Sequence, residues 1–518
     1  MSEQPQDQQT LLQALRDPAR YPHPVTGPEV VETHISTVFL TGDYAYKIKK
    51  PVDFGFLDFS TLEKRRHFCE EELRLNTRLA PALYLEVVPI TGTPEAPELD
   101  GSGEPIEYAV KMRQFDQSQL FDRLLAEDAV DASLMRRVAE ILADFHQRAA
   151  VAGADTPYGT PEAVFAPMAQ NFEQLRGLID DPERLKQLAC LEDWTRRRFD
   201  ELRPLIERRK AEGHVRECHG DVHLGNIALV DGEVTLFDGI EFNDFFRWGD
   251  VMSEMAFLTM DLDDRGRHDL SAVVLDTWLG ATGDYEGVRL LRFYQVYRAM
   301  VRAKVASFRL AQPGLEAHER EAVLASFQSY ADLAERYTQP ETPKLVLMNG
   351  VSGAGKSHVS ARLAERMGAV RLRSDVERKR LAGLRPEQSA SAEPGTGLYG
   401  PGMTERTYAR LHEISRWLLN EGLPVIVDAT FLTRAQRDHF RDLPVAPVIL
   451  RVEADEDTLR RHIEERARIG GDPSDADLRV LETQLASEEP PGDDEPCLRM
   501  QWDAPLPEAL FSRDRRAC

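Results

Sequence analysis

One segment of eight residues, 350–357, constrains the fold of this chain more than any other. It reads Gly-Val-Ser-Gly-Ala-Gly-Lys-Ser and satisfies every fixed position of the pattern G-x-x-x-x-G-K-[ST]. The apolar run Leu345–Met348 precedes it, and a helix-like run, His358–Met367, follows it. A strand, a glycine-rich turn and a helix in this order direct successive backbone N–H groups and a helix N-terminus toward one point, so the segment predicts a phosphate-binding loop.

The fixed positions of this loop have separate physical roles. Gly350, Gly353 and Gly355 permit backbone angles that residues with a Cβ atom avoid. Lys356 is expected to contact the terminal phosphates of a nucleotide, and the Ser357 hydroxyl is expected to bind Mg²⁺. A glycine-rich turn that binds nothing is the alternative, and it is disfavoured because eight positions and both flanks match.

The chain after residue 344 alternates short apolar runs with helix-like segments. This order predicts an α/β domain whose parallel sheet is covered by helices on both faces. In such sheets the functional residues gather at the carboxyl ends of the strands. The apolar runs are Leu345–Met348, Val370–Leu372, Val425–Val427 and Val448–Val452.

Candidate functional side chains follow two of these strands. Asp375 is expected to accept a proton from an attacking hydroxyl, and Arg378 to grip the acceptor one helical turn later. A helix N-cap role for Ser374 or Asp375 stays open. Asp428, at the end of the next strand, is a candidate Mg²⁺ partner for Ser357.

An arginine-rich helix, Leu459–Arg466, runs into the glycine- and proline-containing segment Gly470–Asp475. Such a pair suits a mobile lid that closes over a triphosphate, and a solvated, salt-bridged helix is the alternative. This region resembles the P-loop kinases of the polynucleotide 5′-kinase, zeta-toxin and gluconate-kinase type. The resemblance implies that Asp375 is the general base and that Arg466 clamps the phosphates, although His462 stands where a further arginine is usual.

A second motif lies at His219–Asn226 and reads His-Gly-Asp-Val-His-Leu-Gly-Asn. The alternating run that follows contains an Asp-Gly pair at 231–232, which predicts a tight hairpin that brings Asp238 back beside Asn226. Asp221 could then receive a hydroxyl proton while Asn226 and Asp238 hold Mg²⁺ on a triphosphate. This is the division of roles that phosphoryl transfer requires.

Two other interpretations of this motif are open. Cys218, His219 and His223 are potential zinc ligands, but a fourth ligand at the usual spacing is not evident. The motif could also be a loop of polar capping residues. We favour phosphoryl transfer over both.

The motif resembles the catalytic loop of the aminoglycoside phosphotransferase and choline-kinase superfamily, a protein-kinase-like fold, over roughly residues 25–335. The resemblance implies a lysine that contacts the α- and β-phosphates and a glutamate that pairs with it. Lys47 matches the lysine, and Glu72 matches the glutamate, with Glu71 as second choice. Asp250 matches an aspartate that braces the loop from the next helix.

Lys47 falls in a predicted hairpin, formed by Val30–Leu40, a Thr-Gly-Asp turn and Tyr44–Ile48. Two features depart from the pattern of protein kinases. Asp238 is followed by Gly-Ile rather than Phe-Gly, and no G-x-G-x-x-G loop is present to cover the phosphates.

The polar segment Tyr337–Pro343 contains two prolines, which cannot continue a helix, and it predicts a boundary. Strand-like runs dominate from Val30 to Leu120, and helical periodicity begins at Ala132. We therefore expect an α+β protein-kinase-like two-lobed domain followed by an α/β P-loop domain with a parallel sheet. The expected parts are an N-terminal extension at 1–24, the aminoglycoside phosphotransferase-like kinase domain at 25–336, a linker at 337–343 and the P-loop kinase domain at 344–518.

Composition limits the partners of the chain. Its 64 basic and 88 acidic residues give a formal net charge of −24, which disfavours bulk nucleic-acid binding. The sequence has no run of ~18 apolar residues and no secretory signal pattern, so no membrane partner is expected. Five scattered cysteines without a CxxC pair fit a reducing cytoplasm.

The sequence thus predicts a cytoplasmic, bifunctional phosphotransferase that uses ATP and Mg²⁺ in each domain and phosphorylates hydroxyl groups of unidentified small molecules. One alternative is a ligand-binding kinase-like module coupled to an ATPase switch. Another is a nucleic-acid 5′-hydroxyl kinase in the C-terminal domain. A basic cluster keeps that second alternative open, and it comprises Arg371, Arg373, Arg378, Lys379 and Arg380.

Overall fold

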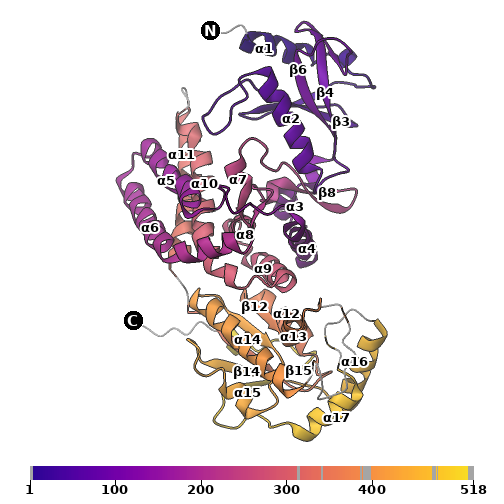
Figure 1. Ribbon diagram of the computed structural model, residues 1–518, viewed down its shortest axis with the longest axis vertical. Helices are drawn as coiled ribbons and strands as arrows, with labels where there is room; N and C mark the ends of the chain where they lie inside the picture. Colours follow the sequence, from indigo (N-terminus) through magenta and orange to yellow (C-terminus); the bar gives the residue numbers. More distant parts are fainter. Residues whose placement is uncertain are drawn as a thin grey trace. The chain divides into compact units, whose positions relative to one another are not determined.

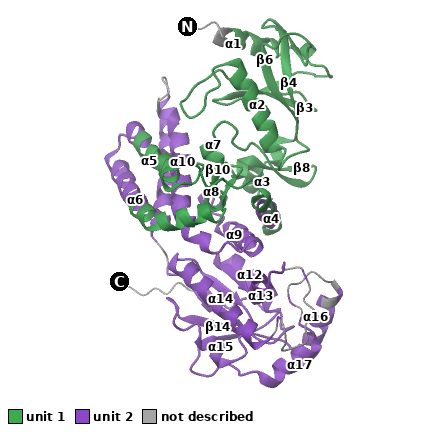
Figure 2. Cartoon of the chain, in the orientation of Figure 1, with its two compact units in different colours: residues 1–134, 144–174, 196–261 green, residues 135–143, 175–195, 262–518 purple. Residues whose placement is uncertain are grey.

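The computed structural model describes residues 4–311, 315–339, 342–385, 388, 398, 400–469, 474 and 476–511 (Figure 1). Residues 340 and 341 of the predicted linker and 1–3 of the predicted extension lie outside these ranges. The chain forms two compact units (Figure 2). Unit 1 comprises 1–134, 144–174 and 196–261, and unit 2 comprises 135–143, 175–195 and 262–518.

The first part of unit 1 is an antiparallel sheet. Among the described residues it has six strands in the order β1-β2-β3-β6-β4-β5. Helix α2 (Leu62–Asn76) begins at Thr61, whose hydroxyl accepts the Lys64 N–H as an N-cap. The strands are β1 (Glu29–Glu32), β2 (Ser36–Leu40), β3 (Tyr44–Lys49), β4 (Tyr84–Thr93), β5 (Ala96–Leu99) and β6 (Glu107–Arg113).

The predicted hairpin is present, but the run before its turn forms two strands, β1 and β2, instead of one. β2 pairs antiparallel with β3 across the Thr-Gly-Asp turn. The long run expected as one strand is interrupted, because the Thr33 hydroxyl accepts the N–H groups of Ile35 and Ser36 and turns the chain between β1 and β2.

The N-terminal segment contributes to the core of this sheet. Leu11 and Leu15, in and after helix α1 (Gln4–Ala14), pack with Tyr21 against Phe39 and Tyr46. The predicted N-terminal extension therefore carries residues that the sheet needs in order to bury its apolar face.

The helices that follow support a short pair of hairpin strands, β8 (Ile227–Val230) and β9 (Glu233–Leu236). Asp231 and Gly232 join them with φ values of 53° and 83°, as the Asp-Gly pair predicted. β7 (Val215–Glu217) pairs antiparallel with β10 (Trp248–Asp250). The helices of this stretch are α3 (Phe121–Ala126), α4 (Ala132–Arg148), α5 (Pro161–Leu178), α6 (Pro182–Ala211), α7 (Asp244–Arg247) and α8 (Val251–Asp264).

Unit 2 contains a parallel sheet of five described strands in the order β12-β13-β11-β14-β15, as the predicted fold class requires. The strands are β11 (Leu345–Asn349), β12 (Val370–Arg373), β13 (Val425–Asp428), β14 (Pro447–Glu453) and β15 (Cys497–Gln501), the last of which the sequence did not reveal. The helices are α9 (His268–Thr282), α10 (Leu291–Ser307), α11 (Ala317–Thr338), α12 (Lys356–Met367), α13 (Ser374–Leu381), α14 (Pro401–Asn420), α15 (Arg434–Asp438), α16 (Glu456–Ile469) and α17 (Leu478–Ser487).

Helices that precede the predicted linker pack against this sheet within unit 2. The Asp276 carboxylate on α9 accepts the Arg371 N–H of β12 at 2.7 Å. The Arg380 guanidinium of α13 donates to the Gly280 carbonyl at 2.8 Å. The P-loop sheet therefore shares its unit with helices α9 to α11. None of the described helices is both long and apolar enough to cross a membrane.

Candidate active sites

Two lysines and a glutamate form the centre of the candidate site in unit 1. Lys47 and Lys49 are two residues apart on β3, so their side chains lie on the same face. Lys47 Nζ lies 2.8 Å from Glu72 Oε1 on α2 and 2.6 Å from Asp238 Oδ1. Lys49 Nζ lies 2.7 Å from Glu72 Oε2 and also pairs with Glu241. The structure thus brings together Lys47, Glu72 and Asp238, as the sequence predicted.

The charges of this group stabilise one another. Burial alone would lower the pKa of Lys47, but the carboxylates of Asp238 and Glu72 outweigh it and hold that pKa well above the usual value. Burial likewise opposes the ionised form of Glu72, and the two lysines overcome it and lower its pKa. Glu71, the second choice from sequence, pairs instead with Arg74 at 2.8 Å.

The catalytic-loop residues lie beside this group. Asn226 Nδ2 donates to the Asp221 carbonyl and to Asp221 Oδ2, both at 3.0 Å. His223 Nε2 lies 3.4 Å from the same Oδ2. The Phe237 N–H donates to the Asn226 carbonyl at 3.0 Å, which returns Asp238 to the side of Asn226. The predicted proton acceptor and the two predicted Mg²⁺ ligands are therefore assembled in one place.

Two buried carboxylates on α8 accept hydrogen bonds from backbone N–H groups of this loop. Glu254 Oε1 accepts the Gly220 N–H at 2.6 Å, and Glu254 Oε2 lies 2.6 Å from His146 Nε2. Asp261 Oδ2 accepts the Leu224 N–H at 3.0 Å. Sequence reasoning missed both carboxylates. Their signal was present, since the two acidic residues are seven positions apart on an otherwise apolar helical face.

The role expected for Asp250 is not the one that the structure gives it. Its carboxylate binds the Arg209 guanidinium through two bonds of 2.8 Å and accepts the Met252 N–H. The bracing expected of Asp250 comes from Glu254, one helical turn later in the chain.

The zinc alternative predicted a different grouping from the one observed. His219 Nε2 is bonded to the Phe237 carbonyl at 2.9 Å. Cys218 lies near His146 and Glu254, and all three side chains are buried. Because the Glu254 carboxylate is already bonded to His146 and to the Gly220 N–H, hydrogen bonds inside the protein account for this group.

In unit 2 the phosphate loop connects β11 to α12. Gly353 and Gly355 have φ values of 84° and 85°, in the left-handed region. A Cβ atom on Gly353 would lie 2.6 Å from the Leu459 carbonyl oxygen, and one on Gly355 would lie 2.7 Å from Trp502 Cβ. Glycine is therefore required twice over, by backbone angle and by close packing.

Lys356 lies at the start of α12, and its Nζ donates to the Val351 carbonyl at 2.8 Å. Burial lowers the pKa of Lys356 to about 8, against the opposing charges of Asp428 and Asp375, while Arg466 lowers it further. The charges of both predicted carboxylates and of the predicted lid arginine therefore influence the protonation of the P-loop lysine.

Asp375 lies inside the first turn of α13 rather than at its N-cap, which is Arg373. Its Oδ1 accepts from Arg378 Nη1 at 2.7 Å, and the Asp375 side chain remains 25% exposed. The N-cap alternative is therefore wrong for Asp375. Arg378, expected to grip an acceptor, is bonded to the predicted base in this structure.

The remaining predicted residues of unit 2 have these positions. Ser360 Oγ donates to Asp428 Oδ2 at 3.0 Å, one helical turn beyond the exposed Ser357. Arg466 on α16 donates to the Ala476 carbonyl at 2.5 Å. Of the predicted lid segment, residues 470–473 and 475 lie outside the described residues.

Four of the five cations of the basic cluster on β12 and α13 are paired with carboxylates or buried. The Arg371 guanidinium lies 3.6 Å from Asp276, Arg378 pairs with Asp375, and Arg380 pairs with Glu377. Lys379 is buried. These pairings weaken the sequence feature that kept a nucleic-acid substrate open, and Arg373, the fifth cation, is partly buried.

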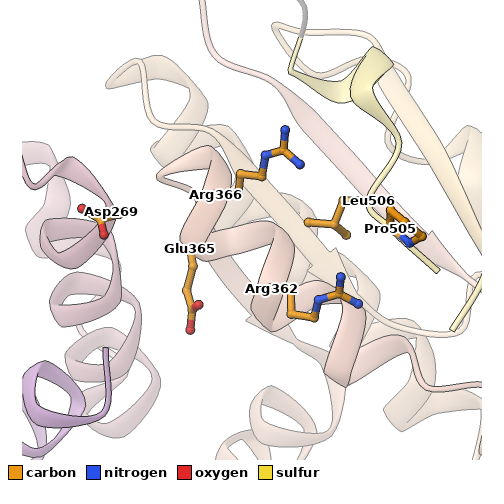
Figure 3. A pocket seen from close by; sticks show the side chains of 6 residues that line it. All are labelled: Asp269, Arg362, Glu365, Arg366, Pro505 and Leu506. Atoms are coloured by element: carbon orange, nitrogen blue, oxygen red, sulfur yellow. The ribbon is translucent and has the colours of Figure 1, made fainter. Parts of the chain in front are cut away.

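Unit 2 has a cavity of about 480 Å³, and Figure 3 shows the side chains that line it. It borders the last turns of α12, where Arg366 is ten residues and therefore about 15 Å from Lys356. Two of its arginines are bonded, Arg362 to the Ala504 carbonyl and Arg366 to Glu508. Its lining residues are Asp269, Arg362, Glu365, Arg366, Pro505 and Leu506.

The donor sets of both sites fit ATP with Mg²⁺. Asn226 and Asp238 offer the oxygen ligands that Mg²⁺ prefers, and the Asp238 side chain is 45% exposed. In unit 2 the Ser357 hydroxyl and Asp428 offer the same chemistry next to Lys356. Each set therefore combines a cation for phosphate oxygens with hard oxygen ligands for a metal.

Comparisons with known proteins match two parts of the chain. Residues 57–291 match the model of the phosphotransferase enzyme family, and residues 345–491 match an AAA domain. Uncharacterized proteins of Mycobacterium tuberculosis and Mycobacterium bovis are each 34% identical over 469 residues, covering 88% of this chain and 90% of the relative. Both predicted domain resemblances are confirmed by the positions of the two family matches.

Solved structures with similar parts include two kinases. A choline/ethanolamine kinase family protein from Mesorhizobium loti is 13% identical, covers 63% of this chain and 99% of its own, and has a TM-score of 0.37. A gluconokinase from Sinorhizobium meliloti is 22% identical, covers 32% of this chain and 86% of its own, and has a TM-score of 0.23.

Proposed function

Since this chain belongs to the same family as its mycobacterial relatives and is a kinase, with a match to a phosphotransferase family and to an AAA domain, we propose that it is bifunctional. Each domain transfers the γ-phosphoryl group of ATP to a hydroxyl group of a small molecule. The observation that carries this proposal is a repeated arrangement. In each unit, a phosphate-contacting lysine and a carboxylate that can accept a proton lie with oxygen ligands suited to Mg²⁺.

In unit 1, Lys47 is positioned to contact phosphate oxygens, and Asn226 and Asp238 are positioned to hold Mg²⁺. The metal, when bound, neutralises charge on the phosphates during transfer. Asp221 accepts the proton of the acceptor hydroxyl. Glu254 fixes the Gly220 N–H and so orients the residue next to the base.

In unit 2, the N–H groups of the P-loop and Lys356 bind the phosphates, and Ser357 with Asp428 hold Mg²⁺. Asp375 accepts the proton of the second acceptor after Arg378 releases it for that role. Arg466 approaches from α16, where its cation can stabilise the charge of the transferred group.

Two observations weigh against the alternatives. The internal pairing of the basic cluster disfavours a nucleic-acid 5′-hydroxyl kinase. The complete set of Lys47, Asp221, Asn226 and Asp238 disfavours a binding module without catalysis in unit 1. A cytoplasmic location is part of the proposal, because ATP is the phosphoryl donor and the described cysteines are free thiols.

The test is phosphoryl transfer from γ-labelled ATP to a metabolite extract by the full chain with Mg²⁺. Asp221→Asn should remove one set of labelled products, Asp375→Asn another, and the double variant both. Asp155→Asn, at an exposed loop position, is the matched control and should keep both sets. Release of inorganic phosphate alone, without a labelled acceptor from either unit, would favour the ATPase switch.

A further inference from the structure

A glutamine of α17 contacts the phosphate loop of unit 2, and no part of the proposed chemistry uses it. Gln484 Oε1 accepts the Ser352 N–H at 2.7 Å. Ser352 is the third residue of the phosphate loop and is only 8% exposed. Because a buried N–H group that loses its acceptor destabilises the conformation around it, this bond helps to fix the loop at Ser352.

The peptide group that Gln484 binds also holds the P-loop lysine. The Ser352 N–H and the Val351 carbonyl belong to one planar peptide unit. Lys356 Nζ donates to that carbonyl at 2.8 Å. The unit cannot turn its N–H away from Gln484 without moving its carbonyl as well. Gln484 and Lys356 are therefore linked through a single rigid group.

Packing holds α17 against the phosphate loop. Leu481 is fully buried and belongs to one apolar cluster with Val351 and Ala354 of the loop. It lies three residues before Gln484, so both side chains lie on the same face of α17. The Asp477 side chain caps the N-terminus of this helix. The position of Gln484 is thus set by a capped helix and a buried leucine, and not by its own hydrogen bond alone.

The chain directly after α17 makes a second link to the loop. Glu488 binds Arg451 at 2.6 Å. The Arg451 guanidinium also donates to Asn349 Oδ1 at 3.0 Å. Asn349 directly precedes Gly350, where the phosphate loop begins. The loop is therefore held by the same stretch of chain at its start and at its third residue.

We infer that Gln484 is a positioning residue for Lys356. It fixes the peptide unit whose carbonyl holds the Lys356 ammonium group, so this cation is in place when the terminal phosphates of the nucleotide bind. The inference rests on the function proposed for unit 2. A cation that is already oriented loses less conformational entropy on binding phosphate than one that must first be ordered.

A direct contact between the Gln484 amide and a phosphate oxygen is the rival explanation, since the amide also carries two N–H donors. The two explanations differ in whether the effect of Gln484 requires Lys356. A positioning residue acts through the lysine, so its removal should have no further effect once the lysine is gone. A direct contact should contribute with or without it.

The test is a double-mutant cycle on the full chain with Gln484→Met and Lys356→Met. Methionine nearly keeps the shape of glutamine but lacks the amide oxygen. ATP binding to unit 2 is measured with Mg²⁺, from the protection against hydrogen exchange that rising ATP concentrations give to the amides of 350–367. Gln484→Met should weaken this binding by about tenfold when Lys356 is present and should have almost no further effect in the Lys356→Met chain.

Gln388→Met is the matched control, because Gln388 Oε1 accepts the Arg385 N–H at the same 2.7 Å but at an exposed position. It should leave ATP binding unchanged. Thermal unfolding of every variant ensures that affinities are compared between folded chains. For the labelled products that depend on Asp375, Gln484→Met should raise the KM for ATP by a similar factor.

The outcomes separate the inference from the function beneath it. Equal weakening by Gln484→Met in both backgrounds would assign the amide a direct contact with the nucleotide and overturn the inference. A lower unfolding temperature with unchanged ATP affinity of the folded chain would reduce Gln484 to a structural role, with the same consequence. Coupled losses of ATP binding, with no labelled product from the parent chain, would support the positioning role and remove the transfer function. A parent chain in which ATP gives 350–367 no protection would remove both.

Discussion

The two lysines that we propose to contact phosphate have opposite surroundings. Lys47 lies within 2.8 Å of two carboxylates, Glu72 and Asp238, which hold its pKa well above the usual value. Lys356 donates to a neutral carbonyl, that of Val351, and burial lowers its pKa to about 8. The first charge is compensated inside the folded chain, whereas the second is left for the ligand.

This difference indicates which negative groups stabilise the buried lysine of each unit. Unit 1 builds a network of charges that must form as the chain folds. Unit 2 places its lysine at a loop of backbone N–H groups, where a bound triphosphate supplies the missing negative charge. Loss of the lysine should therefore damage the fold in unit 1 and mainly nucleotide binding in unit 2.

The largest effect is expected for the two proton acceptors. Asp221→Asn should slow transfer by unit 1 by ~10²–10⁴-fold, or about 3–5.5 kcal/mol of barrier, with ATP still bound. Asp375→Asn should do the same for unit 2. Product-specific assays with labelled ATP measure each rate separately. A single substitution that removed both sets of products would show one composite reaction instead of two.

The next effect concerns stability. Lys47→Ala leaves Glu72 and Asp238 without their shared cation, and we expect a loss of about 3–5 kcal/mol in unit 1. Lys356→Ala should leave the stability of unit 2 unchanged or slightly raised, because it removes a poorly solvated ammonium group. Hydrogen exchange of β3 and α12 amides reports the two units separately.

The double variant Lys47→Met/Glu72→Gln is the control for that measurement. It should recover part of the loss, since without Lys47 the single Lys49 ammonium faces both Glu72 and Glu241, and neutralising Glu72 removes the excess negative charge. Equal losses at Lys47 and Lys356 would contradict the contrast between the two lysines.

A smaller effect is expected where α9 meets β12 in unit 2. Asp276→Ala removes the acceptor for the Arg371 N–H and should destabilise unit 2 by about 1–3 kcal/mol. Asp276→Asn retains an acceptor oxygen and should lose less. Fragments 262–518 and 344–518 can be compared by thermal unfolding. If the shorter fragment is as stable as the longer one, these helices are not needed and the linker at 337–343 is a simple tether.

The smallest expected effect is the uptake of less than one proton when ATP binds to unit 2. With a pKa near 8, Lys356 is about half protonated at pH 8, and a bound triphosphate restores its charge, so ATP binding to unit 2 should take up about half a proton there. Lys47 stays charged throughout and should contribute none. Calorimetry in two buffers with different ionisation enthalpies measures the uptake, and Lys356→Met should abolish it.

The lowered pKa of Lys356 also predicts how the stability of unit 2 changes with pH. The unfolded chain keeps a lysine pKa near its ordinary value of ~10.4, so between pH 8 and that value the unfolded state binds more protons at Lys356 than the folded state. The contribution of Lys356 to the stability of unit 2 therefore rises as the pH increases through this window. The Lys356→Met chain should lack this contribution.

Local patterns in the sequence carried much of the architecture. The Asp-Gly pair at 231–232 predicted a hairpin that the structure contains, and the phosphate-loop pattern predicted the strand, turn and helix around Gly353. These features depend on contacts between residues close in the chain, which the sequence displays directly.

Other features could not be read in this way. Glu254 and Asp261 were missed, and Asp250 was given the wrong partner, because their partners come from different elements. β15 was missed because it follows an acidic loop and mixes polar with apolar residues, with only Met500 buried. The sharing of unit 2 between α9 and the P-loop sheet depends on which surfaces meet, which no periodicity specifies.

By itself, the sequence indicated the two classes of domain, the candidate phosphate-contacting lysines and the candidate bases, and the Asp-Gly turn. The phosphate loop and the Asp-Gly turn follow from residue type and spacing, since glycine permits a backbone that other residues do not, whereas Lys47 and Glu72 were indicated by the resemblance to a kinase superfamily. The tertiary structure alone decided that Lys47 is paired with two carboxylates whereas, among the described residues, Lys356 donates to a backbone carbonyl, and it set Glu254 against the loop that carries Asp221. Both results depend on distances between residues far apart in the chain, and the interaction of charges falls with distance and with the water around them.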